Sequence, residues 1–175
     1  MSNMELPDRA ALLAHLTALL SAAPEGHDHG RASDVRTAVC VIDVDGYDAM
    51  FGRDPSGTMQ VMGEIVRRLD RLVRSGDVLG ALRPGRLALV VRISPVVAGS
   101  LSGRIEGAVA MPLEVGGELV SLSVLVGTAF APVGRPTDTD RRVGTPRAAG
   151  RNTSAEDLMS AAERDVELQL ARRSR

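Results

Sequence analysis

The chain has 175 residues, of which 44% are hydrophobic, and its 21 basic and 22 acidic residues leave a formal net charge of −1. A chain of this length can bury one sizeable core, so we expect one soluble domain. The near-neutral balance argues against bulk binding to nucleic acid or to an anionic membrane. Because the sequence shows neither a membrane-spanning apolar run nor a secretory leader, we expect a cytoplasmic protein.

The N-terminal segment, residues 1–24, is predicted to form an amphipathic helix. A Pro-Asp opening precedes leucines at positions 12, 13, 16, 19 and 20, which is the spacing of one apolar helical face. The polar loop that follows contains His27, Asp28 and His29. Their spacing matches no closed zinc pattern, so we interpret this segment as a solvated loop.

An apolar, β-branched run at residues 35–44 predicts a strand at the centre of a sheet. Cys40 lies inside this run and is expected to be a small buried hydrophobe rather than a nucleophile. Asp43 and Asp45 stand at the C-terminal end of the strand. Acidic residues at this position are typical of a strand whose carboxyl end opens on a site.

A helix and a hairpin are predicted next. Apolar residues recur at helical steps from residue 54 onward, and Gly76 is expected to end that helix. Two short apolar strands then fill residues 78–93. Pro84 and Gly85 lie between them at the positions that a type II turn favours, because proline fixes φ and glycine tolerates a positive φ.

The next part of the chain predicts a second helix within residues 96–110 and another long strand over residues 116–134. That strand could be the second arm of a hairpin turned at Gly116 and Gly117. Residues 133–153 are rich in proline, glycine and arginine and have no periodicity, so we expect a flexible surface loop.

A final helix is predicted over residues 154–175, where Ser154 and Asp157 have the spacing of a capping box. The order of helix, strand, helix, hairpin, helix, strand and helix is typical of an α+β sandwich with helices packed over a mixed sheet.

Several local strings, in this order and spacing, resemble the GGDEF domain of diguanylate cyclases. "LPDRAALLAHLTALL" is similar to the family's opening "LPNRRxLxxxLxxxL", "VIDVDGY" to its "DxDxFK" strand, and "VSLSVLVGTAFAP" to its "vtvSiGvA" strand. The resemblance covers nearly the whole chain. It implies one nucleotidyl-cyclase-like domain over residues 1–175, an α+β sandwich in which helices flank a central mixed, mainly antiparallel sheet.

The signature of the family falls on the turn of the predicted hairpin, at Arg83, Pro84, Gly85, Arg86 and Leu87. In the family, two glycines let the backbone approach the GTP phosphates, and an acid at the third position completes a two-metal site with a strand aspartate. Asp43 matches that aspartate, but the third position here is glycine and the fourth is arginine. One carboxylate alone is a poor Mg²⁺ site, so we interpret Asp43 as vestigial and expect no cyclase activity, no cofactor and no metal.

A second motif of the family is retained. Many of these cyclases carry an Arg-x-x-Asp inhibitory site that binds the product, cyclic di-GMP, and here Arg74 and Asp77 have that spacing, while Arg104 matches a third, more distant arginine. Arginine can bond bidentately to guanine O6 and N7, and aspartate can accept from the guanine N1 and N2 donors. The alternative is that Arg74 caps the end of its helix and pairs locally with Asp77.

The sequence therefore predicts a cyclic di-GMP receptor on an inactive GGDEF domain, with Arg74, Asp77 and Arg104 as ligand-binding residues. In the family's inhibitory mode, ligand molecules often bridge two protein surfaces, so a ligand-bridged homodimer is expected, together with an unidentified protein partner and without nucleic acid or membrane. The alternative is a nucleotide-independent interaction module, in which the first helix or the loop at residues 133–153 meets a protein partner.

Overall fold

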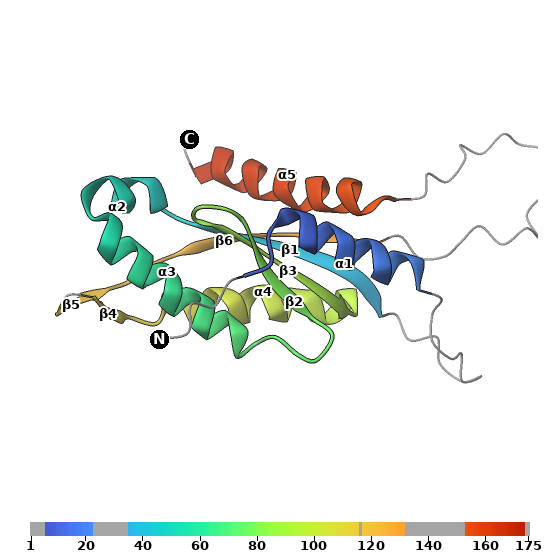
Figure 1. Ribbon diagram of the computed structural model, residues 1–175, viewed down its shortest axis with the longest axis horizontal. Coiled ribbons are helices and arrows are strands. Elements are labelled where there is room, and N and C mark those ends of the chain that lie inside the picture. Colours follow the sequence, from blue (N-terminus) through green and yellow to red (C-terminus); the bar gives the residue numbers. More distant parts are fainter. Residues whose placement is uncertain (1–5, 23–34, 116, 132–152, 174–175) are drawn as a thin grey trace, which may run out of the picture.

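The computed structural model describes residues 6–22, 35–115, 117–131 and 153–173 (Figure 1). The predicted His27, Asp28 and His29 loop lies outside the described residues, as does nearly all of the loop expected at 133–153. The elements in chain order are α1 (Arg9–Ser21), β1 (Arg36–Val44), α2 (Tyr47–Arg53), α3 (Pro55–Asp70), β2 (Val78–Arg83), β3 (Arg86–Ile93), α4 (Pro95–Ala110), β4 (Leu113–Val115), β5 (Glu118–Val120), β6 (Val124–Phe130) and α5 (Ala155–Arg173).

A four-stranded sheet with the order β2-β3-β1-β6 forms the centre of the molecule, and all three of its pairings are antiparallel. β1 is an inner strand, as its apolar sequence predicts. Successive side chains of a strand point to opposite faces, so Val39 and Val41 pack with α1 and α5, while Cys40 and Ile42 pack with α3 and α4. Figure 1 shows these two helical layers on either side of the sheet. The expected α+β fold is confirmed.

Both edges of this sheet have partners. On the β2 side, Ala81 N donates to Pro7 O at 2.8 Å. On the β6 side, helix α5 takes the place of a further strand, because Asp165 Oδ2 accepts from Thr128 N at 3.2 Å and Gln169 Nε2 donates to Val126 O at 3.0 Å. These contacts occupy backbone groups that an open sheet edge would offer to another chain.

The predicted start of the last helix is confirmed in detail. Ser154 Oγ accepts from Asp157 N at 3.1 Å, and Asp157 Oδ2 accepts in return from Ser154 N at 3.1 Å. This reciprocal capping box satisfies backbone donors that the helix itself leaves unpaired. The acidic residues of the first turn also lie at the favourable end of the helix dipole.

The expected long strand over residues 116–134 is divided in two. β4 and β5 pair as the predicted hairpin, with Val115 opposite Glu118, but they form a separate two-stranded sheet. The chain then leaves this sheet at residues 121–123 and enters the main sheet as β6. The break follows from the pairing partners, since β5 pairs with β4 and β6 with β1.

Helix α3 ends at Asp70, so the prediction that Gly76 ends it is wrong. The helix ends in a tighter turn, in which Leu72 N donates a hydrogen bond to Leu69 O and Val73 N donates one to Asp70 O, each three residues back. Gly76, with φ of 91°, belongs instead to a separate turn before β2. The short helix α2 between β1 and α3 was not predicted. None of the described helices is both long and apolar enough to cross a membrane.

Packing of α5 on β6 requires a glycine. A Cβ atom at Gly127 would lie 2.4 Å from Ala162 O and 2.8 Å from Val166 N, both backbone atoms that a side-chain rotation cannot move. Replacing Gly127 with alanine is expected to lower the free energy of unfolding by about 2 kcal/mol, measured by urea denaturation.

The matched control for Gly127 is Gly107, an exposed glycine of α4 at which an added Cβ would have no atom within 4 Å. Alanine is expected to stabilise the protein there by up to about 1 kcal/mol, because glycine is a poor helix former. Equal stability of the two variants would contradict the packing described for α5.

Candidate functional site

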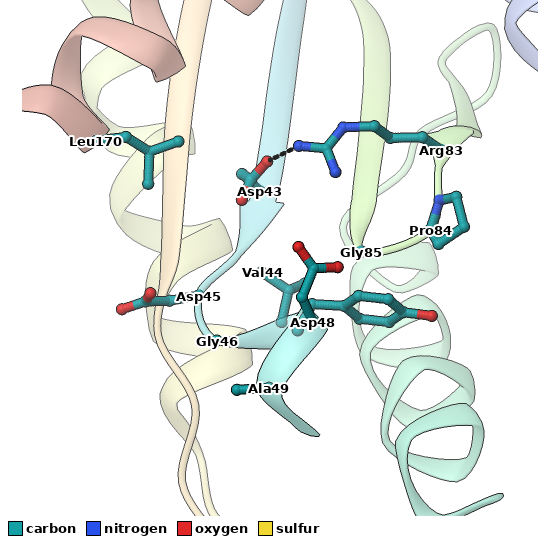
Figure 2. A pocket seen from close by; sticks show the side chains of 11 residues that line it. Asp43, Val44, Asp45, Gly46, Asp48, Ala49, Arg83, Pro84, Gly85 and Leu170 are labelled. Carbon is teal, nitrogen blue, oxygen red and sulfur yellow. Dashed lines mark hydrogen bonds and ion pairs between the residues drawn. The ribbon is translucent and has the colours of Figure 1, made fainter. Parts of the chain in front are cut away.

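A groove of about 370 Å³ opens at the carboxyl end of β1. Its walls come from the end of β1, the start of α2, the turn between β2 and β3, and one residue of α5 (Figure 2). The lining residues are Asp43, Val44, Asp45, Gly46, Tyr47, Asp48, Ala49, Arg83, Pro84, Gly85 and Leu170. The structure therefore brings the predicted Asp43 and the turn at Pro84 and Gly85 into one site.

The β2–β3 hairpin has the turn that its sequence predicts. Arg83 and Arg86 lie opposite each other across the turn, and Gly85 has φ of 74°, which is the left-handed conformation that the third residue of a type II turn requires. Val44 N donates to Gly85 O at 2.9 Å. The turn is therefore attached to the end of β1 and cannot move independently of the groove.

Arg86 is the most buried charged residue of the site, with 6% of its side chain exposed. It lies opposite Asp43 in the sheet, and its Nε donates to Asp43 Oδ2. Its Nη2 lies 2.7 Å from Glu167 Oε1 on α5, a contact whose geometry is that of an ion pair rather than of a directed hydrogen bond. Burial lowers the pKa of Arg86, but the two carboxylates outweigh burial and raise it above its usual value. Arg86 is therefore a permanent positive charge.

Arg83 adds a second, weaker contact to the same carboxylate. Its Nη2 donates to Asp43 Oδ2 at 3.2 Å, and Figure 2 shows the two side chains pointing toward each other across the groove. About half of the Arg83 side chain, 51%, is exposed, so solvent screens this pair. Asp43 thus accepts from two guanidinium groups, and Arg86 is the stronger partner.

The residues present do not fit a magnesium site. Mg²⁺ needs carboxylate or other hard oxygen ligands in octahedral geometry, whereas Asp43 already pairs with two arginines and the turn offers glycine at the third signature position. Asp45 points away from Asp43 in Figure 2 and accepts from Ser123 Oγ at 3.0 Å. Across the described ranges there is no group of three or more His, Cys, Asp or Glu residues that could hold a metal.

The predicted inhibitory-site residues lie away from the groove. Arg74 and Asp77 form a closed turn, because Asp77 N donates to Arg74 O at 3.0 Å and Arg74 N donates to Asp77 Oδ2 at 3.0 Å. Both contacts of this turn use the backbone of Arg74, and its side chain is exposed. Arg104 is exposed on α4, a separate helix that packs against α3. In the described part of the chain, neither guanidinium has an ion-pair partner.

The alternative interpretation of Arg74 is wrong about the helix cap, whereas the local pairing with Asp77 is present through the backbone of Arg74. Because α3 ends at Asp70, with Arg71 as its C-cap, Arg74 does not cap the helix. Asp77 binds the backbone N–H of Arg74 instead of its guanidinium. The Arg74 side chain is therefore available to a ligand.

Comparison with known proteins agrees with this architecture. No protein-family model matches the sequence, and no curated protein matches it either. Solved structures do match. A sensory box/GGDEF family protein from Caulobacter crescentus is 22% identical, with a TM-score of 0.70 over 93% of this chain and 92% of that one. A GGDEF domain from Pseudomonas aeruginosa is 20% identical, with a TM-score of 0.72 over 93% and 83%. The chain has the GGDEF fold.

A further solved GGDEF domain is informative because of its ligand. The GGDEF domain of DgcB from Caulobacter crescentus, in complex with c-di-GMP, is 16% identical to this chain, with a TM-score of 0.71 over 98% of this chain and 92% of that one. Identities at this level establish a shared fold and leave function to the residues of the site.

Two residues that shape this site, Tyr47 in the groove and Glu167 behind Arg86, were not singled out from the sequence. Glu167 reaches Arg86 from the last helix of the chain, and no local pattern in a helix rich in charges distinguishes it from its neighbours. Tyr47 lies beside the turn, and its only signal was its position directly after the acidic end of β1. Leu170 of α5 also lines the groove.

Replacing Arg86 with methionine removes the charge while keeping much of the side-chain volume. The free energy of unfolding is expected to fall by about 2 kcal/mol or more, because Asp43 would keep only the half-exposed Arg83 as its partner. The control is Arg83→Met, which is expected to cost less than about 1 kcal/mol. Urea denaturation of the two variants checks this order, and equal losses would contradict the central place given to Arg86.

Proposed function

We propose that this chain is a receptor for c-di-GMP, built on a GGDEF fold that does not catalyse cyclisation. The observation that carries the proposal is the closed turn of Arg74 and Asp77, in which the Asp77 carboxylate is bound to the backbone N–H of Arg74 while the Arg74 side chain is exposed. The fold is also that of the DgcB domain, whose structure is of a complex with c-di-GMP.

The lack of catalysis follows from the charges of the groove. Phosphoryl-transfer sites of this kind place metal ions between carboxylates and the phosphate oxygens. Here Asp43 is neutralised by Arg86 and Arg83, and position 85 carries no side chain at all. GTP could still contact the groove, but the acid that would complete a two-metal site with Asp43 is missing at position 85, and the other carboxylates of the groove, Asp45 and Asp48, lie outside the signature turn.

Recognition of the ligand rests on three side chains. In the proposed complex, Arg74 bonds to the O6 and N7 acceptors of one guanine, and its planar group can also stack on a purine. Asp77 uses its remaining acceptor capacity for the N1 and N2 donors of a guanine, and Arg104 neutralises a ligand phosphate. Because hydrogen bonds already close the backbone of this turn, binding has to order the Arg74 side chain but not the turn itself.

The output of such a receptor is a change in association. A ligand that presents two guanines and two phosphates can bridge two copies of the same surface, so a ligand-bridged homodimer is the expected assembly. Such coupling would be reciprocal, because whatever favours the dimer also raises the affinity for the ligand.

The competing function is a nucleotide-independent protein-interaction module. Helix α1 offers little to such a partner through its leucine face, because Leu12 and Leu16 are fully buried against the sheet and α5. The second surface considered for this module, residues 133–153, lies almost wholly outside the described residues. The receptor is therefore the function that the described residues support best.

Titration calorimetry with c-di-GMP, accompanied by light scattering, tests the receptor directly. We expect saturable binding with an increase in mass, and no comparable binding of GTP or cyclic di-AMP. Arg74→Ala is expected to weaken binding at least about tenfold, because the ligand would lose one or two charge-assisted hydrogen bonds. The thermal stability of this variant should change little, because the Arg74 side chain is exposed.

Two control variants sharpen this experiment. Arg71→Ala removes an exposed arginine of equal charge just before the turn and is expected to leave the affinity nearly unchanged. Asp77→Asn keeps an oxygen that can accept from Arg74 N but alters the guanine contacts, so it should weaken binding without unfolding the turn. Wild-type affinity in Arg74→Ala, or equal losses in Arg74→Ala and Arg71→Ala, would sink the assignment.

A further inference from the structure

We infer that Tyr47 and Arg86 together close the groove to divalent metal ions. Arg86 neutralises the Asp43 carboxylate, which would otherwise be free to bind a metal ion. Tyr47 occupies the space that a side chain at position 85 would need. This inference rests on the part of the proposed function that concerns the absence of catalysis, and it names the residues that cause it. Because it concerns the groove and not the Arg74 turn, it can be tested independently of c-di-GMP binding.

The exclusion by Tyr47 is steric. A Cβ atom at Gly85 would lie 2.5 Å from Cγ, 2.8 Å from Cβ and 2.9 Å from Cδ1 of Tyr47. These atoms are at the root of the tyrosine side chain, so rotation about its outer bonds does not clear the space. An acid at the third signature position would meet the same atoms, because every side chain begins with a Cβ.

Tyr47 is held in place by a packing contact on its own helix. Its ring stacks on Phe51, with ring centroids 5.9 Å apart and planes inclined by 19°. The two residues lie one turn apart on α2, which is the spacing that brings helical side chains together. Tyr47 therefore has a packing partner on its own helix, and moving it away from the turn would disturb that stack.

The exclusion by Arg86 is electrostatic. A divalent ion at Asp43 would lie close to the Arg86 guanidinium, whose pairs with Asp43 and Glu167 keep it charged and buried. Ion and guanidinium would repel each other in a site of low dielectric. Displacing Arg86 would in turn leave Glu167 without this partner. Asp43 can therefore pair with Arg86 or bind a divalent ion, but it cannot do both.

A double-mutant cycle on stability tests the steric half. Gly85→Ala in the wild-type background is expected to lower Tm by several degrees more than Gly117→Ala. Gly117 is the matched control, because it has a similar φ of 86° but no atom within 4 Å of its Cβ position. In the Tyr47→Ala background this excess should shrink but not vanish, because alanine removes Cγ and Cδ1 but keeps the Cβ that lies 2.8 Å away.

Two outcomes of the cycle would overturn the inference. The first is a Gly85→Ala loss no larger than that of Gly117→Ala, which would mean that Tyr47 moves aside freely. The second is an excess loss that persists unchanged in the Tyr47→Ala background, which would mean that another part of the turn causes it.

Titration calorimetry with Mn²⁺ alone tests the electrostatic half without reference to catalysis. The wild-type protein is expected to show no saturable binding at millimolar Mn²⁺, and Gly85→Asp is expected to show none either, with a lowered Tm. Saturable Mn²⁺ binding to the wild type that Asp43→Asn abolishes would refute the inference. So would binding gained by Gly85→Asp while Tyr47 and Arg86 are in place. If Gly85→Asp fails to fold, the wild-type titration and the alanine cycle still decide.

Discussion

The buried pairing of Arg86 with Asp43 and Glu167 is the constraint on which the rest of the site depends. A guanidinium with 6% of its side chain exposed needs compensating charge. Asp43 supplies that charge from β1 and Glu167 supplies it from α5. One side chain of β3 therefore joins the central strand to the last helix. Because α5 also covers the edge of β6 and packs over Gly127, this charge cluster and the apolar core hold the same elements together.

The same pairing decides what the groove can do. The resemblance to diguanylate cyclases implies that a nucleotide and its ions would meet at the end of β1 and the turn of the hairpin. In this chain the carboxylate of β1 is neutralised from within the protein, and the turn passes close to Tyr47 with no room for a side chain. The Asp43 carboxylate of the groove is thus already paired within the protein. This is why the proposed receptor function rests on Arg74, Asp77 and Arg104, which lie outside the groove.

Much of this architecture could be predicted from the sequence, because its determinants are local. The apolar run of β1, the Pro-Gly turn with its positive φ, and the capping box at Ser154 each depend on neighbours in the chain. The missed features depend on distant partners. Glu167 meets Arg86 only when α5 packs on the sheet, the break between β5 and β6 depends on which strands they pair with, and the close contact of Tyr47 with Gly85 requires α2, which was not predicted.

Incubation of the protein with GTP and Mg²⁺ or Mn²⁺, followed by chromatography for c-di-GMP, tests the central claim most directly. The account predicts that GTP is recovered unchanged, because Asp43 is paired with Arg86 and the signature turn supplies no acid at position 85 to share the ions. Robust formation of c-di-GMP that is lost in Asp43→Asn would contradict it, since Asp43 would then be a working metal ligand.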